Sequence, residues 1–145
     1  MPRFSASARA SVAATAARGP SLYNIASACS PKIVEVGVFN TTTTAFAACL
    51  TRLTATGTQG AGLTETKHDA NGPAADATGF QTHTADATAG DEIVRASIGA
   101  AVGAGIVWTF GAGGLSIPTG TANGIGILCP TGTGQVFDFY IVWDE

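Results

Sequence analysis

The sequence predicts an all-β protein, and two strand patterns together with the composition carry that prediction. The segment 31–57 reads PKIVEVGVFN, then TTTT, then AFAACLTRLTATG, so two runs rich in β-branched residues flank a threonine turn. The segment VFDFYIVWDE at 136–145 is another strong strand pattern. With 19 glycines and one methionine, the composition is poor in helix formers and rich in turn and strand residues.

Length and charge restrict the class of protein. A chain of 145 residues has room for one domain with its own core. Charged residues make up 12% of the chain, about half the usual share of a soluble protein. We therefore expect something other than water to cover part of the surface. The net charge of −3 gives no electrostatic basis for nucleic acid binding, which needs a basic stripe.

Residues 1–21 are predicted to form an extended basic arm. Arg3, Arg9 and Arg18 are the only charged residues among the first twenty, and no sustained apolar run marks a signal peptide. The Arg/Ser-rich composition also resembles a transit peptide, but we prefer an arm that lies on a neighbouring subunit. We expect this arm to become ordered only on an assembled particle and to contact a partner through its three arginines.

The next elements in the chain are a hairpin and a long loop. The segment 31–57 is interpreted as a β-hairpin with the threonines as its turn. Between residues 64 and 90 the hydrophobic pattern lapses, and long excursions of this kind are often functional. We expect this loop to meet another chain; the alternative is a solvated loop packed only on its own domain. The candidate contact residues in it are His68, Asp69, Phe80 and His83.

The last third of the chain predicts short buried strands between tight turns. No charged residue occurs from Ala96 to Phe137, so a membrane span has to be considered. Glycines and Pro118 break this stretch too often for a spanning helix. The strand runs are DEIVRASIGAAV, GIVWTFG, LSIP, NGIGILCP and QVFDFYIVW, and this spacing is typical of a β-sandwich or barrel.

Catalytic and metal-binding patterns are not evident. The two histidines lie near aspartates, but the spacing fits neither a zinc site nor a calcium loop. No G-x-S-x-G elbow surrounds a serine. The strand carboxylates Glu35, Asp138 and Asp144 are interpreted as solvent-facing or ion-pairing residues rather than a glycosidase pair. We therefore expect no enzymatic activity, no cofactor and no metal.

Three cysteines leave an odd one and form no CxxC motif. Cys49 and Cys129 lie in apolar strand runs, where cysteine usually acts as a small buried hydrophobe. A disulfide within or between chains stays open. Because no convincing signal peptide is present, we favour free thiols, Cys29 included, in a cytoplasmic assembly environment.

Several of these runs together resemble the small structural proteins of tailed bacteriophage virions. They are VEVGVFNTTTTAF, TRLTATG, GDEIVRASIGAAVGAGIVWTFG, GLSIPTGTANGIGI and FDFYIVWDE, and the resemblance covers residues 22–145. It implies a single-domain antiparallel β-sandwich, jelly-roll-like, that follows the arm.

The resemblance also implies a function. It indicates a non-enzymatic virion component, a head decoration or cement protein, whose partners are the major capsid protein or other virion proteins. A homo-oligomer is expected, and a trimer is expected by analogy. The alternatives are a neck or tail component, or a receptor- or carbohydrate-binding module. A carbohydrate module would show exposed aromatic residues around a cleft, for which the candidates are Tyr23, Phe80 and Trp108.

Overall fold

The computed structural model describes residues 1–10, 18–25, 29–130 and 135–145. The described residues form strands and no helix. The strands are β1 (Arg3–Arg9), β2 (Ser21–Tyr23), β3 (Lys32–Asn40), β4 (Phe46–Ala55), β5 (Thr58–Gln59), β6 (Thr66–Lys67), β7 (Thr78–Phe80), β8 (His83–Ala85), β9 (Thr88–Ile98), β10 (Gly105–Thr109), β11 (Leu115–Ser116), β12 (Gly124–Leu128) and β13 (Phe137–Asp144).

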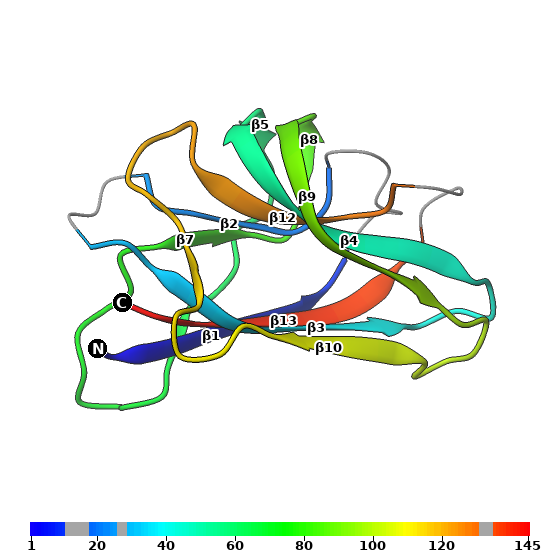
Figure 1. Ribbon diagram of the computed structural model, residues 1–145, viewed down its shortest axis with the longest axis horizontal. Coiled ribbons are helices and arrows are strands. Elements are labelled where there is room, and N and C mark those ends of the chain that lie inside the picture. The colour runs from blue at the N-terminus through cyan, green and yellow to red at the C-terminus, as the bar shows by residue number, and fades with distance from the viewer. Residues whose placement is uncertain (11–17, 26–28, 131–134) are drawn as a thin grey trace.

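Two antiparallel sheets face each other across one core (Figure 1). The first sheet has the strand order β10-β3-β13-β1-β6, and β11 also pairs with β3. The second sheet has the order β7-β2-β12-β4-β9. A separate pair, β5 and β8, projects beyond the second sheet in Figure 1. The predicted all-β sandwich is thus confirmed.

The strand pairing is nested in the manner of a jelly roll. The pairs β1–β13, β2–β12, β3–β10 and β4–β9 are all antiparallel, and successive pairs lie alternately in the first and the second sheet. Each pair joins an earlier strand to a later one, and each lies within the previous pair along the sequence. Eight strands in this order make a double-sheet jelly roll.

Strand β13 shows how the sequence pattern produces the core. Its residues alternate strictly between buried and half-buried positions, and Phe137, Phe139, Ile141 and Trp143 are the buried set. Because side chains in a strand point alternately to opposite faces, this alternation gives one face to the core and one to solvent. The strong strand predicted from VFDFYIVWDE is confirmed, and it occupies the centre of the first sheet.

The expectation of an arm outside the sandwich is wrong for the described residues of segment 1–21. Residues 3–9 form β1, which pairs with β13 from Arg3↔Asp144 to Arg9↔Asp138. Phe4 is buried and its ring stacks on Trp143, with the two centroids 5.9 Å apart. The alternation of Phe4 and Ala6 with polar residues is a short strand pattern, which the arginines and serines obscure in sequence. Residues 11–17 lie outside the described residues.

The predicted hairpin at 31–57 is also corrected. Both strands form, but β3 belongs to the first sheet and β4 to the second, so they do not pair. The connection 41–45 has no glycine to support a tight hairpin turn. Instead the buried Asn40 fixes a crossing between the sheets: its Nδ2 donates to the carbonyls of Thr44 (2.9 Å) and Gly99 (2.8 Å).

The long loop predicted at 64–90 is mostly irregular, but it contains the three short strands β6, β7 and β8, and β9 begins within it at Thr88. Strand β7 pairs with β2 and extends the second sheet. Ala77, His83 and Ala87 are buried. The loop therefore packs on its own domain, as in the alternative interpretation, while its contact with another chain stays a prediction.

The place of β1 in the core makes a prediction about stability. Phe4→Ala removes a buried aromatic ring that stacks on Trp143, and such a change costs roughly 3–5 kcal/mol of unfolding free energy. Urea unfolding followed by tryptophan fluorescence measures this cost.

Ser7→Ala is the matched control, since Ser7 lies on the same strand with its side chain exposed. We expect it to change stability by less than about 0.5 kcal/mol. Equal stability of the two variants would show that β1 does not belong to the core.

Candidate functional site

The arginines expected to contact a partner make ion pairs within the chain. Arg3 donates to Asp144 from Nε (2.7 Å) and Nη2 (2.9 Å), and Arg9 donates to Asp138 in the same fork-like way. Hydrogen bonds from these guanidinium groups hold the pKa values of both carboxyl groups below their usual range. The interpretation of the two aspartates as ion-pairing residues is therefore confirmed.

The third arginine pairs with a carboxylate of the 64–90 loop. Nε of Arg18 donates to Oδ1 of Asp86 at 2.6 Å, and both side chains are about half exposed. The structure does not bring Arg18 together with Arg3 and Arg9, which lie on β1. The contact of the three with a partner stays a prediction.

The four loop candidates also separate into two places. His68 and Asp69 are exposed, and the backbone N–H of His68 donates to the carbonyl of Arg3 at 2.9 Å. Phe80 and His83 instead lie against Tyr23 on the second sheet, where the three rings contact one another.

His83 is buried and poorly solvated. Its Nε2 lies 2.7 Å from Oγ of Ser21, and its Nδ1 has no hydrogen-bond partner among the described residues. Burial lowers the pKa of the imidazole below its ordinary value. His83 is therefore a neutral core residue at neutral pH rather than an exposed contact.

The aromatic residues named for a carbohydrate cleft do not form one. Tyr23 is fully buried, and burial raises its pKa to about 12. Trp108 is half-buried and packs against the core. Phe80 is also half-buried, and it packs against a smaller buried cluster that contains Tyr23 and Leu53.

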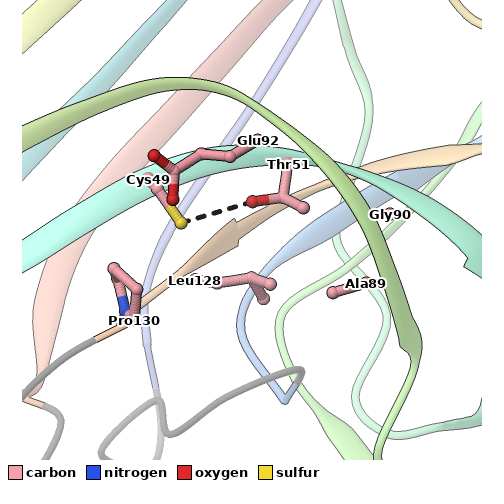
Figure 2. Close-up of a pocket in the computed structure, with 7 residues that line it drawn as sticks. All are labelled: Cys49, Thr51, Ala89, Gly90, Glu92, Leu128 and Pro130. Carbon is pink, nitrogen blue, oxygen red and sulfur yellow. Dashed lines mark hydrogen bonds between the residues drawn. The ribbon is translucent and has the colours of Figure 1, made fainter.

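An apolar hollow of about 240 Å³ lies on the second sheet, between β4, β9 and β12 (Figure 2). Sγ of Cys49 lies 3.2 Å from Oγ1 of Thr51, and the carboxylate of Glu92 is on the same side of the hollow. Burial raises the pKa of the Cys49 thiol, so the thiol stays protonated and is a weak nucleophile. Cys49 and Cys129 are buried free thiols.

The outer face of the first sheet carries two aromatic rings, which we call the aromatic platform: Phe39 on β3 and Tyr140 on β13. Their centroids are 6.2 Å apart and their planes differ by 24°. Tyr140 covers Gly37 and Phe39 covers Gly105, at places where a Cβ would overlap the ring. Each ring therefore lies on the sheet, because its neighbouring strand offers a glycine there.

A polar hollow of about 520 Å³ follows the platform along the same face. Its lining includes Arg3, Glu35, His68, Thr109 and Asp144. Tyr140 connects the two features, since its hydroxyl donates to Oε1 of Glu35 at 2.7 Å. Burial and the nearby Glu35 carboxylate raise the pKa of Tyr140 to about 12, so this donor is retained.

A third feature is the uncharged edge, which we define as residues 99–114: the β9–β10 connection, β10 and the turn after it. The segment contains no charged residue, and Val102 (70% exposed) and Val107 (44%) are its large exposed side chains. Strand β10 is the last strand on its side of the first sheet and pairs with β3 without a register shift. A regular, uncharged edge strand is a template for pairing with another chain.

The neighbouring edge of the second sheet is different. Strand β9 has register shifts opposite Thr51 and Leu53, and an Arg95–Glu92 ion pair lies on it. Bulges and charges are the features that keep an edge strand from pairing. The uncharged edge is therefore the more suitable of the two for association.

Sequence reasoning missed the aromatic platform. Its signal was nevertheless present, since Tyr140 occupies an outward position in the alternation of β13, and Gly37 interrupts a run of β-branched residues. A glycine inside a strand often marks the close approach of another group. Only the strand register shows which ring approaches which glycine.

The described part of the chain contains no group of three or more His, Cys, Asp or Glu residues placed to hold a metal ion. It also contains no helix that could cross a bilayer. Comparisons with protein-family models, with curated proteins and with solved structures find no match.

The buried His83 makes stability depend on pH. In the unfolded chain its pKa is about 6.5, whereas in the folded protein it is lower. The unfolded chain therefore binds the proton first, so stability is complete above about pH 6.5 and is lost as the pH falls toward the folded-state value. We expect the urea midpoint to be lower at about pH 5.5 than at about pH 7.5.

His83→Gln is the control variant, and it should remove most of this difference. The paired Asp138 and Asp144 titrate below their ordinary range and leave this pH interval unaffected. A pH difference that persists in the variant would contradict the assignment to His83.

Proposed function

We propose that the protein is a non-enzymatic structural component of a tailed-bacteriophage virion, a decoration or cement protein that binds and stabilises the head shell. Its partners are the major capsid protein or other virion proteins, and it acts within the virion after assembly in the host cytoplasm. The proposal takes the protein to work as a homo-oligomer, with three copies as the expected number.

The uncharged edge is the observation that carries this proposal. Removing charged groups from water costs free energy unless they are paired, and this surface has none. Exposed Val102 and Val107 gain free energy when a neighbour covers them. Many modest contacts of this kind add up when copies are repeated on a shell.

The topology supports the same proposal in a general way. Jelly rolls occur in viral capsid domains, and also in lectins. Because one fold can serve many functions, the topology alone does not select between them. The uncharged edge favours a role in assembly.

Binding to capsids tests the proposal. Purified protein is mixed with undecorated capsids from its own source, the capsids are pelleted, and the pellet is analysed on a gel. We expect saturable binding at a fixed ratio to the shell protein. Val102→Asp places a charge on the uncharged edge and should reduce the bound fraction at least tenfold, because the carboxylate would have to be desolvated.

Gln59→Asp is the matched control, since Gln59 is exposed on β5, away from the uncharged edge, and should leave binding unchanged. Ala70→Asp asks separately whether the 64–90 loop takes part. Wild-type protein that stays in the supernatant would contradict a head decoration role, and neck or tail assemblies would be examined next.

Self-association is a separate prediction. Sedimentation velocity should give a mass of three chains for the wild type. Val107→Asp should shift the distribution toward the monomer, because Val107 is exposed at the middle of the edge strand β10. A wild-type protein that is monomeric over the whole micromolar range would contradict the oligomer.

A further inference from the structure

We propose that the aromatic platform and the polar hollow together bind a neutral saccharide on the outer face of the first sheet. The inference does not depend on a capsid role, although the hollow shares Thr109, Gly111 and Ala112 with the uncharged edge. It rests on two rings that lie on the sheet and on a hollow of about 520 Å³ beside them.

The platform provides the apolar part of such a site. Phe39 and Tyr140 are half-buried, and each lies over a glycine of the adjacent strand, so one ring face rests on the sheet. Saccharide rings have apolar faces made of C–H groups, which pack against aromatic surfaces. Aromatic side chains provide a large contact area and lose little conformational freedom on binding.

The hollow provides hydrogen-bonding groups suited to hydroxyls. Glu35 and Asp144 accept, Arg3 donates, and His68 and Thr109 can do either. Ligand sites commonly combine an apolar surface with a few polar groups that fix orientation. Tyr140 belongs to both parts, since its ring is in the platform and its hydroxyl holds the carboxylate of Glu35.

The charges of the hollow favour a neutral ligand. Arg3 is already paired with Asp144, and Glu35 adds a negative charge whose carboxylate accepts a hydrogen bond from the Tyr140 hydroxyl. An anionic ligand would meet this carboxylate without a free cation among the lining residues. A single nucleic acid strand needs a positively charged groove beside its stacking rings, and the hollow does not provide one.

The spacing along β13 favours a chain of sugar rings over a single ring. Tyr140, Val142 and Asp144 occupy successive outward positions on the same face. Each step of two residues advances about 6.8 Å along a strand. A ligand that contacts both the platform and the Asp144 end of the hollow is therefore longer than one ring.

Saturation-transfer difference NMR with neutral oligosaccharides tests the site. The probes are short malto-, cello-, chito- and galacto-oligosaccharides, and titration calorimetry gives the affinity of any that bind. We expect at least one of them to bind, and Tyr140→Ala and Phe39→Ala each to weaken binding more than tenfold. Tyr140→Phe keeps the ring and loses only the bond to Glu35, so its loss should be smaller, about threefold.

Phe80→Ala is the matched control, since Phe80 is a half-buried aromatic residue on the second sheet and should leave the affinity unchanged. Melting curves of all variants establish that they are folded. The proposal is overturned if the wild type binds none of the probes, or if folded Tyr140→Ala binds as tightly as the wild type. Tyr140→Ala should still pellet with capsids as the wild type does. A failure of the saccharide proposal is therefore distinguishable from a failure of the capsid proposal.

Discussion

The pairing of β1 with β13 is the interaction on which the rest of the structure depends. It joins strands from opposite ends of the sequence and places β13 between β1 and β3 at the centre of the first sheet. The stacked rings of Phe4 and Trp143 contribute most to it, because solvent screens exposed ion pairs such as Arg3–Asp144 and leaves them little net stabilisation. With this pair in place, the inner pairs can nest within it.

The nested pairing also decides which strands remain open at the sides. Among the described strands, β10 pairs only with β3 and β9 pairs only with β4, so each of them is the last strand of its sheet. One of these edges carries bulges and an ion pair, while the other is regular and uncharged. The surface that we propose for assembly is therefore a consequence of the jelly-roll topology, which leaves β10 as an edge strand.

The outer face of the first sheet shows how packing can shape a surface. Tyr140 and Phe39 lie on the sheet because Gly37 and Gly105 stand beneath them on neighbouring strands. A side chain at either glycine would overlap the aromatic ring above it and push that ring off the sheet. The proposed saccharide site is therefore tied to the register of β10, β3 and β13, which the core determines on the opposite face.

The sequence by itself determined the all-β class and the late strands, because alternation along 137–144 depends only on local geometry. It also indicated the uncharged stretch and the ion-pairing role of Asp138 and Asp144. The tertiary structure alone decided that β1 belongs to the core, that β3 and β4 lie in different sheets, and that two rings meet two glycines. Each of these depends on pairing between residues far apart in sequence, and a local pattern carries no information about which strand lies beside which.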